Sequence, residues 1–116
     1  MTWLVTGGAG YIGSHVVRAL GAAGMSTVVL DDLSTGHESF VPRGVPFVRE
    51  SILDGGAVLQ ALQDHGVTGV IHVAGFKYAG VSVTEPLHTY AQNVTGTASL
   101  LAAMESAGVD RIVFSS

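Results

Sequence analysis

Five short stretches of this 116-residue chain are rich in apolar residues and are separated by segments with more glycine and polar residues. They cover Thr2 to Thr6, Thr27 to Asp31, Pro46 to Arg49, Gly69 to Ala74, and Arg111 to Ser115. Valine, isoleucine and phenylalanine dominate them, which is typical of strands buried on both faces of a parallel sheet. The pattern therefore predicts five strands.

Between these runs, apolar residues recur every three or four positions, which is the helical period. Helices are expected over Ile12 to Ala23, Ala57 to His65, and Pro86 to Ala107, each followed by a glycine suited to a left-handed C-terminal cap. The residues expected to face the core in the three helices are Ile12, Val16, Ala19, Leu20 and Ala23; then Val58, Leu59 and Leu62; then Leu87, Tyr90, Val94, Ala98, Leu101 and Met104.

Strands that alternate with helices form βαβ units, and hence a parallel sheet with right-handed crossovers. The segment from Leu33 to Val45, with its glycine, proline and serine, is expected to be a loop. The sequence stops after its fifth expected strand, which would leave an apolar edge without a covering helix. We therefore expect a single domain over 1–116 that is incomplete, a fragment truncated after strand 5.

Charge and composition narrow the possible partners. The chain has 5 basic and 9 acidic residues, a net charge of −4, and no basic cluster, which argues against nucleic acid. It has no cysteine, so disulfides and thiolate metal sites are excluded. No apolar run approaches the roughly 18 residues of a membrane span, and no signal-peptide pattern precedes the first strand. A cytoplasmic protein that contacts neither membrane nor nucleic acid is expected.

The stretch VTGGAGYIGSH places Gly7, Gly10 and Gly13 between the first expected strand and the first helix. This spacing is a variant of the dinucleotide fingerprint, in which the glycines allow a tight turn, close approach to a pyrophosphate, and close helix–strand packing. The helix N-terminus supplies N–H donors to the phosphates. A glycine-rich turn without a ligand is the alternative. We favour a Rossmann-type doubly wound sheet in the order 3-2-1-4-5.

The second expected strand ends in Asp31, where such folds place the carboxylate that accepts hydrogen bonds from the adenosine ribose. Asp32 adds a second negative charge, and no Arg or Lys lies between Arg18 and Arg43 to hold a 2′-phosphate. The expected cofactor is therefore NAD rather than NADP. Asp32 has an alternative role as a cap for the following loop.

Several motifs resemble the extended short-chain dehydrogenase/reductase family along the whole chain: VTGGAGYIGSH, LDDLSTGH, VIHVAGFKYAGVSVTEP, YAQNVTGT and IVFSS. Within it, the lysine and the Ser-Val-x-x-Pro of AGFKYAGVSVTEP resemble the UDP-hexose 4-epimerases more than the sugar-nucleotide dehydratases. The resemblance implies an isomerase of galactose metabolism that interconverts UDP-glucose and UDP-galactose by hydride transfer through a 4-keto intermediate. It also implies a homodimer formed through helices such as Pro86 to Ala107.

The same resemblance implies which residues surround NAD, beyond the three glycines. Tyr11 and Ile12 would present backbone amides to the pyrophosphate. The adenosine ribose would contact Asp31, Asp32, Leu33, Ser34, Thr35 and Gly36, and the adenine would contact Ser51 and Ile52. The second half of the cofactor would contact Val73, Ala74, Gly75, Phe76, Lys77 and Asn93.

Some of these positions are also compatible with roles that involve no cofactor. Ser51 stands where the family usually has an aspartate, and a hydroxyl accepts the adenine hydrogen bond more weakly. Lys77 is also compatible with an idle surface lysine, and Asn93 with pairing to buried backbone groups. His72 is better explained as a core histidine than as a catalytic one. The histidines show no spacing typical of metal ligands, so no metal site is expected.

Catalysis in this family uses a Tyr-x-x-x-Lys pair one helical turn apart. Residues four positions after Tyr11, Tyr78 and Tyr90 are His15, Ser82 and Val94, none of which is lysine. No catalytic residue is therefore expected in this chain, and the chain alone should be inactive. Alternatives are the NAD-binding part of a related dehydratase or epimerase, and a non-catalytic NAD-binding module.

Overall fold

The computed structural model describes residues 1–74, 87 and 91–114. Its helices and strands are, in order, β1 (Thr2–Thr6), α1 (Tyr11–Ala22), β2 (Ser26–Leu30), the 3₁₀ turn η1 (Glu38–Phe40), β3 (Phe47–Val48), α2 (Gly55–Asp64), β4 (Gly69–His72), the π-helical turn η2 (Ala91–Thr95), α5 (Gly96–Ala107) and β5 (Ile112–Phe114). The strands form one parallel sheet in the order β3-β2-β1-β4-β5. The expected fold class is confirmed.

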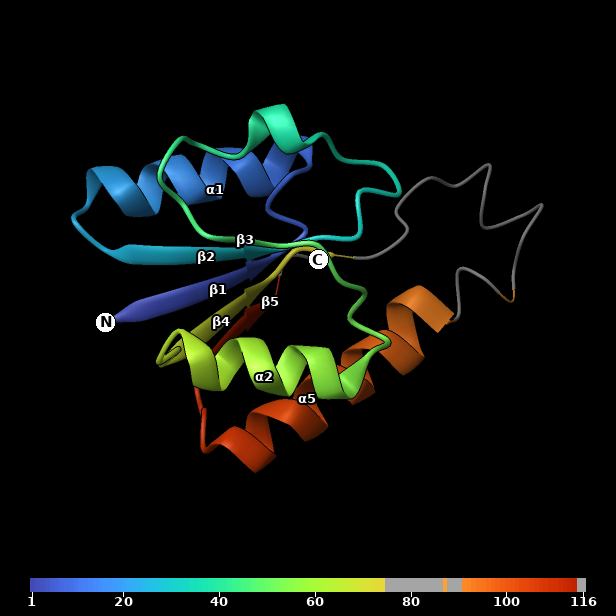
Figure 1. The fold of residues 1–116 in the computed structure, drawn as a ribbon. Helices are drawn as coiled ribbons and strands as arrows, with labels where there is room; N and C mark the ends of the chain where they lie inside the picture. Colours follow the sequence, from blue (N-terminus) through green and yellow to red (C-terminus); the bar gives the residue numbers. More distant parts are fainter. Residues whose placement is uncertain (75–86, 88–90, 115–116) are drawn as a thin grey trace.

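The sheet lies between two helical layers, with α1 on one face and α2 and α5 on the other (Figure 1). Alternate residues of β1 divide between these layers, as the two-residue period of a strand requires. Leu4 joins a core cluster with residues of α2 and α5, whereas Val5 packs with Val17 of α1 and Val29 of β2. Both faces of the central strands are therefore buried, which explains their continuous apolar sequence.

Most expected strands are longer than the observed ones. β1 matches its expected bounds, but the run from Gly69 to Ala74 stops at His72. The Val73 N–H is shared between the carbonyl and the hydroxyl of Thr6, and the Ala74 N–H donates to the hydroxyl, so the regular pairing with β1 ends there. The run from Thr27 to Asp31 shifts to Ser26–Leu30. The third and fifth strands lose a residue at each described end, and Ser115 lies outside the described residues.

The expected inner face of α1 was correct only in part. Val16 and Leu20 are half-buried and pack against the core cluster of Val5, Val17 and Val29. Gly13, Ser14 and Val17 are buried against the sheet, whereas Ile12 is 51% exposed and Ala19 and Ala23 are exposed. The reason is the close contact between the helix start and the glycine turn, which admits only small residues on the side that faces the strand. Apolar periodicity could not show this, because glycine and serine do not count as apolar.

The last expected helix is observed as two parts, and the residues before Ala91 lie outside the described ones except for Leu87. In place of a single helix, η2 is followed by α5, whose buried residues are Gly96, Leu100, Ala103 and Met104. Of the expected inner stripe, Met104 is buried, but Leu87, Val94 and Leu101 are 85%, 51% and 43% exposed. A π turn contains more residues per turn than an α-helix, so it rotates the following residues to a different face.

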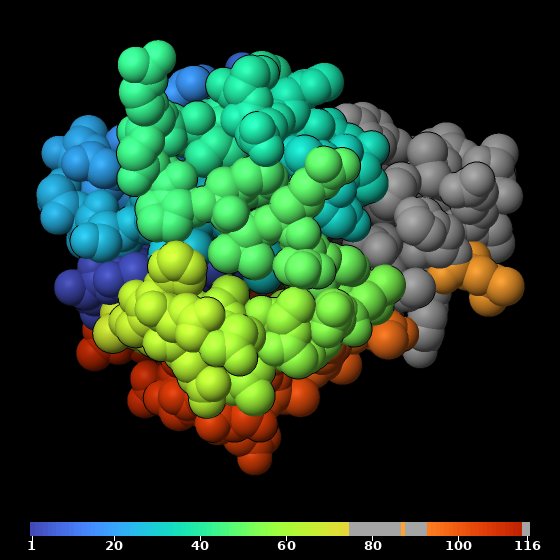
Figure 2. Space-filling view, in the orientation of Figure 1, coloured from blue at the N-terminus to red at the C-terminus, as the bar shows by residue number. Residues whose placement is uncertain are grey.

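The segment expected as a loop, Leu33 to Val45, is irregular apart from η1. Figure 2 shows the residues that follow β2, coloured teal to green, spread over the molecule on the opposite side from the orange and red α5. Within the part of the chain that the structure describes, no helix is both long and apolar enough to cross a membrane.

Candidate nucleotide-binding site

Three segments that are distant in sequence meet at the carboxyl edge of the sheet. The glycine turn follows β1, Asp31 follows β2, and Val73 and Ala74 follow β4. The strand order reverses between β1 and β4, and open α/β sheets bind their ligands outside the strand ends at such a point. The topology therefore brings together the segments that the sequence predicted to hold a dinucleotide.

The glycine turn is packed so closely that side chains have no room in it. Gly7 has φ +72°, and an ideal Cβ there would lie 2.8 Å from the Ala74 nitrogen. An ideal Cβ on Gly13 would overlap the Gly7 carbonyl oxygen. The tight-turn role of Gly7 and the close-packing role of Gly13 therefore agree with the geometry.

The backbone N–H groups in the first turn of α1, next to the glycine turn, donate no hydrogen bond to a capping side chain. Gly10 is the N-cap, its missing side chain provides no cap hydrogen bond, and Tyr11 and Ile12 begin the helix in exposed positions. First-turn N–H groups have no partner within a helix, and they carry the positive end of its dipole. An anionic group at this position would receive both kinds of stabilisation.

Asp31 ties the end of β2 to the glycine turn. Its side chain is 9% exposed, and its two oxygens accept hydrogen bonds from the Ala9 N–H at 3.0 Å and the Leu33 N–H at 2.8 Å. An ionised carboxylate has about four acceptor positions, so two remain for a ligand. The carboxylate is therefore held in place by backbone and still able to accept from a ribose.

Asp32 accepts a hydrogen bond from the Ser34 N–H at 2.9 Å, so its capping role is present. The loop then crosses the glycine turn: the His37 N–H donates to the Ala9 carbonyl at 2.9 Å. An ideal Cβ on Gly36 would lie 2.8 Å from that carbonyl oxygen, which explains glycine at this position. Leu33 adopts φ +62°, and Thr35 is exposed.

The two residues expected near the adenine differ in exposure. Ser51 is half-buried, and its hydroxyl accepts from the Leu53 N–H at 3.1 Å in a local turn. Ile52 is 3% exposed and belongs to the core that contains Leu30 and Val58. Its side chain is therefore committed to packing, and only its backbone is left for contact with a ligand.

The segment after β4 is held by a residue that the sequence reasoning did not select. The Thr6 hydroxyl accepts from the N–H groups of Val73 and Ala74 at 3.1 and 3.2 Å, and it lies 2.6 Å from Nδ1 of His72. The threonine directly before the glycine turn was the available signal.

Gly75, Phe76 and Lys77 lie outside the described residues, whereas Asn93 lies in η2 and is exposed.

His72 is a core histidine, as expected: it is 5% exposed and hydrogen-bonded to two threonines. The described residues contain no group of three His, Asp or Glu side chains placed to hold a metal ion.

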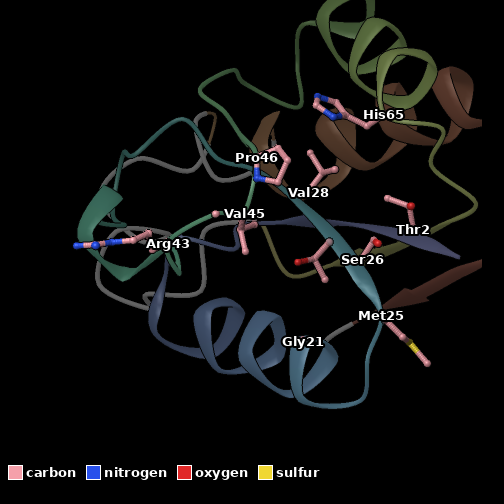
Figure 3. Close-up of a pocket in the computed structure, with 11 residues that line it drawn as sticks. Thr2, Gly21, Met25, Ser26, Val28, Arg43, Val45, Pro46 and His65 are labelled. Carbon is pink, nitrogen blue, oxygen red and sulfur yellow. The ribbon is translucent and has the colours of Figure 1, made fainter.

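A separate pocket of about 440 Å³ lies at the amino ends of the strands, at the end of the sheet opposite the candidate site. Figure 3 shows Thr2, Met25 and Ser26 among its lining residues, at the starts of β1 and β2. Because dinucleotides bind at the carboxyl ends of parallel strands, this pocket is not the candidate cofactor site.

A parallel sheet in this order, with a glycine turn between β1 and α1 and a buried carboxylate after β2, defines a Rossmann-type dinucleotide-binding domain. Residues 3–116 match the family described as the NAD dependent epimerase/dehydratase family. The chain belongs to that family.

Its relatives are named UDP-glucose 4-epimerases. The chain is 45% identical to the one from Azospirillum brasilense over 97% of its own length and 32% of the relative, and 41% identical to the one from Klebsiella pneumoniae over all of its own length and 88% of the relative. The Thermus thermophilus enzyme, solved in complex with NAD, shares 43% identity with a TM-score of 0.95, over 98% of this chain and 37% of that chain. The chain spans about a third of the length of most relatives it matches.

Proposed function

We propose that residues 1–116 form the NAD-binding part of a UDP-hexose 4-epimerase. The observation that carries this proposal is the buried Asp31 carboxylate, which is fixed by the Ala9 and Leu33 N–H groups at the carboxyl edge of the sheet. It is supported by similarity to UDP-glucose 4-epimerases, one of which was solved in complex with NAD.

The dinucleotide would lie across the edge formed by β1, β2 and β4. Its pyrophosphate would face the glycine turn, where Gly10 leaves the first amides of α1 open. Asp31 would accept from the adenosine ribose hydroxyls and repel a 2′-phosphate, with Asp32 adding negative charge. The loop from Leu33 to Gly36 would complete the ribose site, and Ser51 would accept from the adenine.

The other half of the dinucleotide would extend toward Val73 and Ala74 and toward η2, which carries Asn93. When bound, NAD supplies hydride acceptance and return, and it is regenerated in each turnover. Lys77 and its neighbours Gly75 and Phe76 are proposed for the same half on the family resemblance alone.

Epimerisation also needs groups that move the proton of the sugar hydroxyl, and the family's Tyr-x-x-x-Lys pair does not occur in these 116 residues. We therefore propose that the 116-residue chain binds NAD but does not turn over UDP-hexoses. A homodimer is also proposed, supported by the exposed apolar residues Val94 and Leu101 on η2 and α5.

Calorimetric titration of the 116-residue chain with NAD and with NADP tests the cofactor proposal. NAD should bind with measurable heat, and NADP should bind at least about tenfold more weakly because its 2′-phosphate meets two carboxylates. Equal affinities would contradict the role of Asp31. In parallel, UDP-galactose and NAD are incubated with the chain, and detectable UDP-glucose would contradict the expected inactivity.

A further inference from the structure

His72 is a buried titratable side chain for which the proposed function gives no role. It ends β4, and its ring connects three elements. Nδ1 lies 2.6 Å from the hydroxyl oxygen of Thr6 at the end of β1, and Nε2 lies 3.1 Å from the hydroxyl oxygen of Thr97 on α5. The ring also makes an edge contact with Phe114 of β5, with centroids 5.6 Å apart.

The hydrogen bonds of Thr97 determine which proton Nε2 carries. The Thr97 hydroxyl donates to the backbone carbonyl of Asn93 at 2.8 Å, and a carbonyl oxygen can only accept. A hydroxyl has one hydrogen, so Thr97 has none left for His72. Its oxygen must accept from His72, and Nε2 therefore carries a hydrogen.

The hydrogen bonds of Thr6 determine the state of Nδ1 independently. The Thr6 hydroxyl oxygen accepts from the Ala74 N–H and from the Val73 N–H, which also donates to the Thr6 backbone carbonyl at 3.1 Å. Both of these groups can only donate, so among the described contacts of the hydroxyl only Nδ1 of His72 is able to accept its hydrogen. The hydroxyl hydrogen is then directed at Nδ1, and this requires an unprotonated nitrogen. Both threonines thus select the same form of His72, the neutral Nε2–H tautomer.

We propose that His72, held as this tautomer, is a positioning residue that aligns the two segments assigned to the second half of NAD. The Thr6–His72–Thr97 bridge connects the backbone at Val73 and Ala74 to the Asn93 carbonyl in η2. This inference rests on the proposed function, because that function assigns both segments to the cofactor.

The bridge also acts on the glycine turn. An ideal Cβ on Gly7 would lie only 2.8 Å from the Ala74 nitrogen, so the two backbones are in close contact there. A shift of Ala74 after loss of the bridge therefore displaces the turn that faces the pyrophosphate.

The tautomer is tested by nitrogen-15 NMR of the labelled 116-residue chain, because the chemical shifts of the two ring nitrogens distinguish the tautomers. The His72 signals are assigned by their loss in His72→Phe. A protonated Nε2 with an unprotonated Nδ1 is expected. A hydrogen on Nδ1 would overturn the proposal, whether or not the chain binds NAD.

The positioning role is tested with His72→Phe, which keeps a ring beside Phe114, and with Thr97→Val, which keeps the shape of the threonine. Each should weaken NAD binding about fivefold, the scale of one lost hydrogen bond, and should shift the backbone amide signals of Asn93 and Ala74 in the ligand-free chain. The double variant should be no weaker than either single variant, because both remove the same bridge.

Thr27→Val is the matched control, since Thr27 is a threonine buried in β2 near the amino ends of the strands. It should leave NAD affinity and the Asn93 and Ala74 signals unchanged. Additive losses in the double variant, or unshifted Asn93 signals, would overturn the proposal. A wild-type chain that does not bind NAD would contradict the proposed function, and the amide shifts would still decide for or against the bridge.

Discussion

At the scale of single residues, the Asp31 carboxylate combines a structural and a recognition role. It is 9% exposed, and it holds the glycine turn through Ala9 and the following loop through Leu33. Its position at the end of β2 was predictable from sequence, because a strand followed by an acidic residue is a local pattern. Its bond to Ala9 was not, because that contact depends on how the turn after β1 folds.

We expect Asp31→Ala to weaken NAD binding at least about tenfold, because it removes both the ribose acceptor and the two backbone hydrogen bonds. Ser51→Ala should weaken binding only about two- to threefold, since a neutral hydroxyl contributes less than a carboxylate. Titration calorimetry of both variants measures this difference. Similar losses in the two variants would be inconsistent with the assigned roles.

At the scale of elements, α1 packs closely against the end of β1 because glycines at the contact carry no side chain. Gly13 lies against the Gly7 carbonyl, and Ser14 and Val17 follow on the same buried side. Sequence periodicity found the helix almost to the residue and placed Val16 and Leu20 correctly against the core, but it missed the buried side formed by Gly13, Ser14 and Val17. The face is set by backbone contact with the glycine turn, which apolar periodicity does not register.

Gly13→Ala should lower the free energy of unfolding by roughly 2–4 kcal/mol, because its Cβ would overlap a backbone carbonyl that no rotamer change can move. Gly21→Ala in the same helix is the control: an ideal Cβ there meets no described atom within 4 Å. It should raise stability by about 0.5–1 kcal/mol through helix propensity. Urea unfolding of both variants measures the changes, and equal effects would refute the packing argument.

The buried side of α5 was likewise not predictable from apolar periodicity. The sequence predicted the region as helical and predicted its Gly108 cap, which has φ +73°. The expected inner stripe failed because η2 changes the register before α5 begins, leaving Val94 and Leu101 exposed. A π turn has no reliable local signal in side-chain periodicity, so only the folded chain reveals it.

At the scale of the whole molecule, two exposed apolar surfaces favour association. One is the edge strand β5, where Val113 and Phe114 are each 52% exposed, and the other is the helical segment of η2 and α5, where Val94 and Leu101 are exposed. An edge strand with unpaired backbone groups and apolar side chains is prone to pair with other chains. The exposed apolar residues of η2 and α5 suit the closed homodimer proposed above rather than open-ended strand pairing.

Val113→Lys should reduce the formation of large aggregates, because a charge on an edge strand opposes further strand pairing. Leu101→Lys should instead convert a dimer to monomer and leave edge association unchanged. Sedimentation velocity separates these species. Gln63→Lys, on the exposed side of α2, adds the same charge elsewhere and should change neither. If all three variants aggregate equally, the β5 edge is not the associating surface.

The sequence by itself predicted the strands and the glycine turn followed by Asp31, because these depend on local periodicity and short spacings. It predicted the strand order only through the Rossmann-type fold that the glycine fingerprint indicates. The tertiary structure alone decided which side of α1 is buried, where η2 shifts the register, and how Thr6 and Thr97 fix the tautomer of His72. The Thr6–His72 hydrogen bond spans 66 positions and the His72–Thr97 hydrogen bond spans 25. Such contacts depend on the folded arrangement of β1, β4 and α5, which no local pattern encodes.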